Sequence, residues 1–280
     1  MELPPHITRE QRYPVTRNLG WHHVLDSRSL DYRVEPADPA SLNTVEWTPK
    51  VPVLQQDELK KRGIDTAELL GAQEAADGLG ACAPYGCTTA LSIVLDDDRL
   101  AEAGMDTTDP SGGEKFALRW YAAATLMDDL LEKQYPNDDC GTTGIACCKA
   151  GHKEGWYDSY HPITSPLALV TALQSGPVVM GTHWYDAFSY PDGDGFIDSG
   201  DWDKSPIVGG HTVCVARVEE IGRTPDGDLD PQRTVLALRN SWGPGWGEKG
   251  WFRMRLSTYQ REIKNMEAYQ FRVAPRIIRG

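Results

Sequence analysis

The stretch from Leu238 to Trp251, which reads LRNSWGPGWGEKGW, constrains the fold more than any other part of the sequence. It combines one asparagine with tryptophans and closely spaced glycines directly after an apolar run. An asparagine at the end of a buried strand can accept a hydrogen bond from a histidine ring N–H, and an indole can shield that contact from water. The glycines let the backbone turn beneath the indole at φ values that other residues avoid. We therefore interpret the stretch as part of a polar site around Asn240, in preference to a plain glycine-rich turn.

His211 is the histidine best placed to meet Asn240. It lies in IVGGHTVCVA, residues 207–216, an apolar run that predicts a buried strand. A single histidine in such a strand is more often a hydrogen-bonded core residue than a catalyst. Asn240, however, ends the next strand-like run, so the two side chains become neighbours if the strands pair antiparallel. Other histidines have no such partner in the pattern and are expected in structural or surface roles: His22, His23 and His183.

Bulk properties are those of a globular chain large enough for one large domain or two moderate lobes. The 280 residues are 40% hydrophobic and 25% charged. A formal charge of −13 disfavours nucleic acid and anionic membranes as main partners, because both require a basic face. No apolar run of about 18 residues predicts a membrane span. The N-terminal residues lack the apolar core of a signal peptide, so we expect no general secretory export.

The cysteines match no zinc-binding spacing. They stand at positions 82, 87, 140, 147, 148 and 214. We expect buried free thiols and one reactive thiol, with a disulfide between two of the others as an alternative. Two of them, Cys82 and Cys87, lie near a predicted helix start, where the helix dipole stabilises a thiolate. If Cys82 begins the helix, Pro84 falls in the tolerant first turn; if Cys87 begins it, the helix opens on Thr88.

The order of the predicted elements indicates an α+β fold of two lobes. Residues 1–50 are rich in proline and charge and predict an extended arm. Residues 51–170 carry mainly helical patterns, including a long amphipathic helix over 113–134 and a helix that begins at Ser165-Pro166. Residues 171–280 carry mainly strands. A cleft between a helical and a strand-rich lobe is the expected place for the site.

These motifs together resemble the papain-like cysteine peptidase family. The Asn-Ser-Trp-Gly run from Asn240 is the family's most specific motif, and Gly-Gly-His-Thr-Val around His211 is similar to its histidine strand. The sequence LGACAPYG around Cys82 resembles the nucleophile motif of a divergent branch found in actinobacteria and their phages. In that branch an aromatic and then a small residue follow the cysteine, as Tyr85 and Gly86 do here. The resemblance therefore favours Cys82 as nucleophile and leaves Cys87 as the alternative.

What the resemblance implies is a papain-like fold, with a helical lobe, an antiparallel β-barrel-like lobe and the active-site cleft between them. Gln56 is implied as the side-chain donor to the oxyanion, although an extra segment of about 58 to 77 separates it from the cysteine and Gln73 is the alternative. Trp242 is implied as the cover of the histidine–asparagine pair. Gly141, in DCGTTG, is implied as a backbone partner of an extended substrate, with a helix N-terminus as the competing explanation.

No metal or organic cofactor is expected. The acidic loop from Tyr190 to Asp201 partly resembles a calcium loop, but Tyr190 stands where that pattern needs its first carboxylate, so we expect an acidic hairpin.

The predicted function is that of a cysteine peptidase or amide hydrolase acting on a peptide or protein, with a Cys-His-Asn triad and a glutamine oxyanion donor. The alternative is a papain-fold structural or binding protein, for example a phage tail or virion component, with weak or no catalysis. In that case the N-terminal arm is a candidate surface for an assembly partner. The expected location is the cytoplasm or a phage particle.

Overall fold

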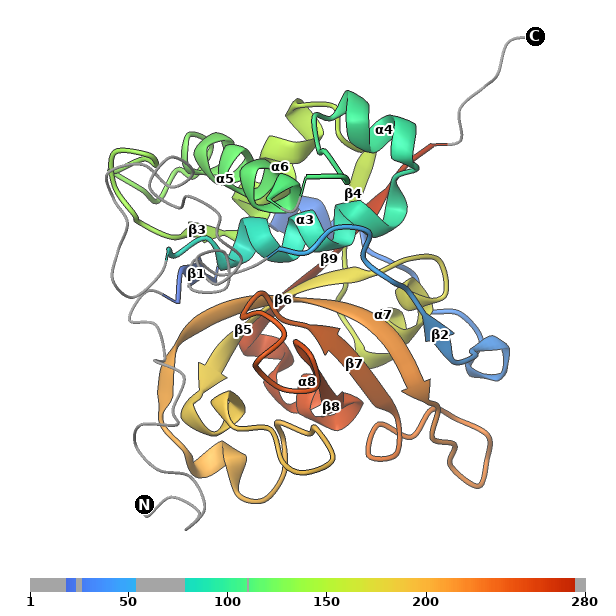
Figure 1. Cartoon of the computed structure of the whole chain (residues 1–280). Helices are drawn as coiled ribbons and strands as arrows, with labels where there is room; N and C mark the ends of the chain where they lie inside the picture. The colour runs from blue at the N-terminus through green and yellow to red at the C-terminus, as the bar shows by residue number, and fades with distance from the viewer. Residues whose placement is uncertain (1–18, 24–26, 54–78, 110, 275–280) are drawn as a thin grey trace, which may run out of the picture.

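The computed structural model describes residues 19–23, 27–53, 79–109 and 111–274. A group of helices lies on one side of a twisted antiparallel sheet, and two further helices lie on its other side (Figure 1). The first group contains α3 (Cys82–Val94), α4 (Asp97–Glu102), α5 (Gly112–Thr125) and α6 (Gly144–Lys153). The second contains α7 (Pro166–Leu173) and α8 (Leu256–Glu262). Short 3-10 turns join these elements: η2 (Ser27–Tyr32), η3 (Pro39–Ser41), η5 (Asp186–Ser189), η6 (Trp202–Lys204) and η7 (Ile263–Asn265).

The main sheet has seven strands, and every neighbouring pair in it is antiparallel. Its order is β4-β9-β5-β6-β7-β8, with β2 beside β6. The strands are β2 (Val45–Glu46), β4 (Ser159–Pro162), β5 (Val178–Tyr185), β6 (Ile207–Glu220), β7 (Val235–Arg239), β8 (Trp251–Arg255) and β9 (Met266–Arg272). The path is open in the described part of the chain, so the strand-rich lobe is an antiparallel sheet and not a closed barrel. The predicted strand around His211 is confirmed as β6, and the predicted strand that Asn240 directly follows is confirmed as β7.

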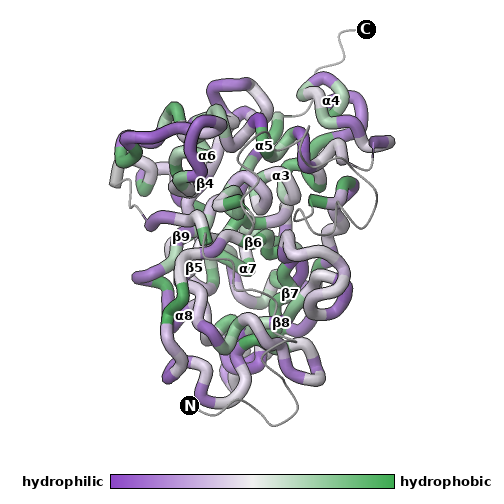
Figure 2. Tube along the Cα trace, turned by 60° about the vertical axis from the view of Figure 1, so that its left-hand side comes forward, coloured by the Kyte–Doolittle hydropathy of each residue, from purple (hydrophilic) through white to green (hydrophobic). Residues whose placement is uncertain are grey.

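The long strand β6 is the centre of the sheet, and its side chains alternate between two hydrophobic cores. Val213 and Val215 face the core shared with α7 and α8, whereas Cys214 and Ala216 face the core beneath α3, α5 and α6. Because both faces of β6 are buried here, its residues are apolar throughout, whereas a strand with one exposed face would be apolar only at every second residue. Hydrophobic segments gather in the interior and hydrophilic ones in the outer loops (Figure 2).

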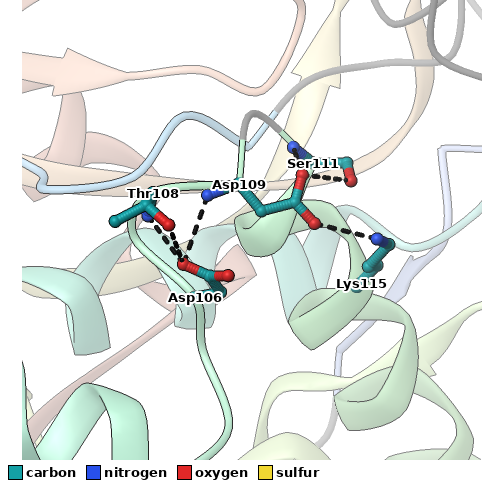
Figure 3. A network of polar contacts seen from close by, with 5 residues as sticks. All are labelled: Asp106, Thr108, Asp109, Ser111 and Lys115. Atoms are coloured by element: carbon teal, nitrogen blue, oxygen red, sulfur yellow. Dashed lines mark hydrogen bonds and ion pairs between the residues drawn. The ribbon is translucent and has the colours of Figure 1, made fainter.

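Local sequence explains where the helices begin. The Ser165 side chain accepts a hydrogen bond from the Ala168 amide, and Pro166 takes the first helical position, as predicted for α7. In front of α5, the Asp109 carboxylate accepts bonds from the Ser111 amide and hydroxyl and forms an ion pair with Lys115 (Figure 3). Asp106 closes the preceding turn through the Thr108 amide and hydroxyl, also seen in Figure 3.

The predicted length of α5 was wrong. The helix ends at Thr125 and does not continue to residue 134. Leu126 and Leu130, which lie in the part of the predicted helix that does not form, are 65% and 63% exposed, so no core extends the helix. The chain turns instead, and the Thr125 hydroxyl accepts a hydrogen bond from the Tyr135 amide.

Part of the predicted N-terminal arm, residues 27–47, lies along the strand-rich lobe, whereas Lys50 bonds to the helical side through the Ser92 hydroxyl and the Leu95 carbonyl. The Val34 amide donates to the Pro162 carbonyl at 3.0 Å, and the Trp47 indole donates to the Leu173 carbonyl at 2.8 Å. Among the described residues, no helix is both long and apolar enough to cross a bilayer.

Candidate active site

His211 and Asn240 form a buried pair at the strand-rich side of the site. The His211 Nε2 and Asn240 Oδ1 atoms are 2.9 Å apart, and the two residues are 1% and 2% exposed. The Ser241 amide also donates to Asn240 Oδ1 at 2.8 Å, which holds the side-chain amide in one orientation. Antiparallel pairing of β6 with β7 brings the two residues together, as the sequence pattern predicted.

Aromatic rings enclose this pair. The Trp242 ring lies 5.0 Å from the His211 ring, and Trp184 meets it edge-on at 4.8 Å. Trp246 lies behind both indoles and donates its N–H to the Ser189 carbonyl at 3.0 Å. Burial lowers the pKa of His211 to about 4, although the bond to Asn240 opposes this shift. Within the described structure the other ring nitrogen, Nδ1, is buried and has no hydrogen-bond partner.

Cys82 is the first residue of α3, and its thiol contacts the strand that carries His211. Backbone groups of Thr212 and Gly20 and the Thr212 side chain form hydrogen bonds with the thiol. Burial is the larger effect and raises the pKa of Cys82 to about 11. With the thiol protonated and the His211 ring neutral, the site holds no ion pair at neutral pH in this covered arrangement.

Cys87 lies further along the same helix in a different environment. Its side chain is fully buried in the core between the helices and the sheet, where its thiol forms a hydrogen bond with that of Cys147. Burial raises the pKa of Cys87 as well. Of the two candidate thiols, the structure therefore brings only Cys82 next to the residue that follows His211.

A short segment, residues 19–23, covers the Cys82 thiol; we call it the cleft segment. The Gly20 carbonyl accepts a hydrogen bond from the Thr142 amide at 2.7 Å, and Gly20 also bridges to Gly210 in parallel orientation. Beyond Gly20, β1 (Trp21–His22) pairs in parallel with β3 (Thr142–Thr143). The cleft segment thus contacts both sides of the site, near the start of α3 (Figure 1).

Comparison with known proteins identifies the family. The sequence profile of the papain family cysteine proteases matches residues 111–271, which is more than half of the chain. The chain belongs to this family. The predicted family and enzyme class are thereby confirmed, and the family implies peptide or protein substrates. The matched range contains His211 and Asn240 but not Cys82.

Solved structures of papain-family proteases share the fold. Xylellain, a cysteine protease from Xylella fastidiosa, superposes with a TM-score of 0.60 over 93% of this chain and 97% of its own, at 16% identity. Digestive procathepsin L 3 from the larval midgut of Tenebrio molitor gives 0.53 over 93% and 78%, also at 16% identity. These similarities confirm the predicted two-lobe papain-like fold. No curated protein matches this protease significantly.

Gly141 of the protease lies beside the cleft segment in a tightly bonded loop. Its amide donates to the Tyr121 hydroxyl at 2.7 Å, and that hydroxyl also bonds to the Asp139 carboxylate. Asp139 in turn accepts from the Gly80 amide, two residues before Cys82. The loop around Gly141 is therefore tied to the turn that leads into α3. Its φ of 68° and its close approach to the Gly20 carbonyl both require a glycine.

The remaining predictions concern the oxyanion glutamine, the cysteines and the acidic loop. Gln56 and Gln73 lie outside the described residues. The six cysteines are free thiols. In the acidic loop, the Asp192 carboxylate accepts bonds from the Asp194 and Phe196 amides, and buried Asp198 binds Arg255. The described residues contain no group of three or more histidine, cysteine, aspartate or glutamate side chains arranged to hold a metal ion.

Proposed function

We propose that the protein hydrolyses peptide bonds with Cys82 as nucleophile, His211 as general base and acid, and Asn240 as the residue that orients His211. The observation that carries the proposal is the 2.9 Å hydrogen bond between His211 and Asn240. The residue that follows His211 on β6, Thr212, contacts the Cys82 thiol. This bond occupies Nε2 and leaves Nδ1 to exchange protons.

In the proposed reaction, His211 takes the thiol proton of Cys82 as the sulfur bonds to the peptide carbonyl carbon. The protonated ring then gives this proton to the amine, the C–N bond breaks, and a thioester remains. The ring next takes a proton from water, whose oxygen attacks the thioester carbon. The C–S bond then breaks as the carboxylic acid leaves, and the protonated ring gives its proton to the sulfur, which restores the Cys82 thiol and the neutral His211 ring.

The oxyanion formed in these steps needs hydrogen-bond donors to stabilise it. The Cys82 amide is one candidate, because the first amides of a helix have no partner within the helix. We propose the Gln56 side chain as the second donor. Trp242 would keep water from the His211–Asn240 bond, a role that its 5.0 Å distance from the ring supports.

Substrate binding has to replace the cleft segment. The backbone beside Gly141 already pairs with the extended chain of β1, which supports the proposal that an extended peptide binds there. Departure of the cleft segment also admits water to the Cys82 thiol and to His211. Since burial is what raises the thiol pKa and lowers the ring pKa, exposure favours the thiolate–imidazolium form that the reaction needs.

Labelling with an irreversible epoxide that alkylates papain-type thiols tests this mechanism. We expect mass spectrometry of peptides to find the label on Cys82, with loss of peptide hydrolysis. Cys82→Ser should lose both labelling and hydrolysis, whereas the matched variant Cys87→Ser should retain both. Hydrolysis that survives in Cys82→Ser, or label found on Cys87 alone, would refute the assignment.

A second candidate function, a binding or assembly protein on the same fold, is favoured by one observation. The cleft segment covers the Cys82 thiol, and the arm residues Val34 and Trp47 are hydrogen-bonded to the strand-rich lobe, as an arm that docks partners would be. The same labelling experiment separates the two functions, since an assembly protein would show neither labelling nor turnover.

A further inference from the structure

Asp139 and Tyr121 form a polar bridge between two backbone segments of the proposed active site. The Gly80 amide nitrogen lies 2.9 and 3.0 Å from the two carboxylate oxygens of Asp139. The Tyr121 hydroxyl donates to Asp139 Oδ1 at 2.8 Å. The same hydroxyl accepts from the amides of Gly141, at 2.7 Å, and Cys140, at 3.1 Å. One continuous chain of hydrogen bonds therefore joins the turn before α3 to the loop before β3.

The bridge is built into the interior of the helical lobe. Tyr121 is completely buried, and its ring stacks on that of Tyr135 at 4.6 Å. Burial raises the pKa of the Tyr121 hydroxyl, so this group stays protonated and can donate to Asp139. The bridged backbones are also in direct contact, since a Cβ on Gly80 would lie 3.4 Å from the Gly141 nitrogen. A shift of one segment is therefore transmitted to the other.

Each bridged segment leads into an amide at the site. α3 begins at Cys82, whose amide is the candidate donor to the oxyanion. On the other segment, the Thr142 amide donates to the Gly20 carbonyl of the extended chain in the cleft. Ala81, which precedes α3, has no side-chain acceptor that could cap the helix, so the Asp139 carboxylate fixes this turn instead. Because Gly80 and Asp139 are 59 positions apart, the spacing of the two amides depends on the bridge.

We propose that Asp139 and Tyr121 are positioning residues for peptide hydrolysis. They hold the turn before Cys82 and the loop before Thr142 at the spacing at which a bound carbonyl group meets both the thiol and its hydrogen-bond donors. The inference rests on the proposed peptidase function. A displacement of about 1 Å in such an arrangement lowers the rate by about 100-fold. We therefore expect loss of the bridge to lower kcat more than it raises KM.

The test compares two reactions of the same thiol. Hydrolysis of an internally quenched peptide passes through an oxyanion, whereas alkylation by iodoacetamide forms a C–S bond as iodide leaves, without an oxyanion. Both reactions require an uncovered Cys82. The quotient of kcat/KM for hydrolysis and the rate constant of Cys82 alkylation therefore cancels changes in the folded fraction and in the cover of the thiol.

In Tyr121→Phe, which removes the acceptor of the Gly141 amide, we expect this quotient to fall about 10- to 100-fold, mainly through kcat. Asp139→Ala should show a similar decrease. Asp139→Asn should recover part of the loss, because its amide oxygen can still accept a hydrogen bond from Gly80.

Two variants of the same chemistry serve as controls. Tyr157→Phe removes another buried hydroxyl of the helical lobe, which donates to the Cys148 carbonyl at 2.6 Å. Asp138→Asn changes the neighbouring carboxylate, which forms an exposed ion pair with Lys133. Both should keep the quotient of the unmodified chain. An unchanged quotient in Tyr121→Phe, or an equal decrease in Tyr157→Phe, overturns the proposal.

Absence of hydrolysis in the unmodified chain would refute the proposed function, and hydrogen exchange then tests the bridge by itself. Mass spectrometry follows peptides that cover residues 79–83 and 139–143 separately. If the bridge couples the two segments, Tyr121→Phe accelerates exchange about tenfold in both peptides, although the lost acceptor served only the second. Faster exchange confined to residues 139–143 overturns the coupling.

Discussion

A methyl group at position 20 should uncover the Cys82 thiol. A Cβ on Gly20 would lie 1.8 Å from the Gly80 carbonyl oxygen and 2.3 Å from its carbon, far inside van der Waals contact. Gly80 cannot retreat easily, because the Asp139 carboxylate holds its amide at 2.9 Å. Gly20→Ala must therefore displace the cleft segment from Cys82.

The size of the effect follows from what holds the cleft segment in place. Burial of the Trp21 side chain, about 150–250 Å², contributes roughly 4–6 kcal/mol, and the hydrogen bond from the Thr142 amide to Gly20 adds about 1 kcal/mol. Relief of the steric overlap removes the Gly20 contacts and part of the Trp21 burial. A loss of about 2 kcal/mol raises the uncovered population, and with it the rate at which Cys82 reacts, by about 30-fold.

The assay is the rate of iodoacetamide labelling of Cys82 under native conditions, followed by mass spectrometry of peptides. Gly193→Ala is the matched control, because a Cβ on Gly193 meets nothing within 4 Å. Cys87 in the core should remain unlabelled in both variants, which verifies that the fold is intact. If Gly20→Ala and Gly193→Ala react at the same rate, the cleft segment does not control access to the thiol.

Two further predictions concern buried polar groups. Asn240→Ala should lower kcat/KM about 10- to 100-fold in steady-state assays, because the His211 ring loses its buried acceptor and its orientation; a decrease of less than twofold would contradict the role of Asn240. For Glu267 the pKa is about 7 in the folded chain against an ordinary 4.5, so its contribution to stability is fully present below pH 4.5 and is lost as the pH rises through 7. Between pH 4.5 and pH 7, urea unfolding should accordingly show that the free energy of unfolding of the unmodified chain falls by about 3 kcal/mol more than that of Glu267→Gln. Parallel pH profiles of the two proteins would refute the raised pKa of Glu267.

Several parts of this protein could be read from residues close together in the chain. The Asn240 motif and the apolar run around His211 each carry a local pattern, and antiparallel pairing of successive strands is the simplest way to join them. For this reason the family, the two-lobe fold and the His211–Asn240 pair were all predictable. The start of α7 at Ser165-Pro166 was predictable because capping is a local interaction. The end of α5 was not, because it depends on whether a core exists for Leu126 to pack against.

The two cysteines mark the boundary between sequence and tertiary structure. Either Cys82 or Cys87 could begin a helix, and local preference does not distinguish them. The fold does, since α3 begins at Cys82 and buries Cys87 against Cys147.

The contact between the Trp21 indole and the Glu267 carboxylate could not be predicted from the sequence. The two residues are separated by 246 positions and carry no shared motif. Short-range patterns determined which elements form, because hydrogen bonding and side-chain alternation act between near neighbours. Tertiary structure decided which thiol meets the His211 strand and which segment covers it, because these contacts depend on how distant elements pack in three dimensions.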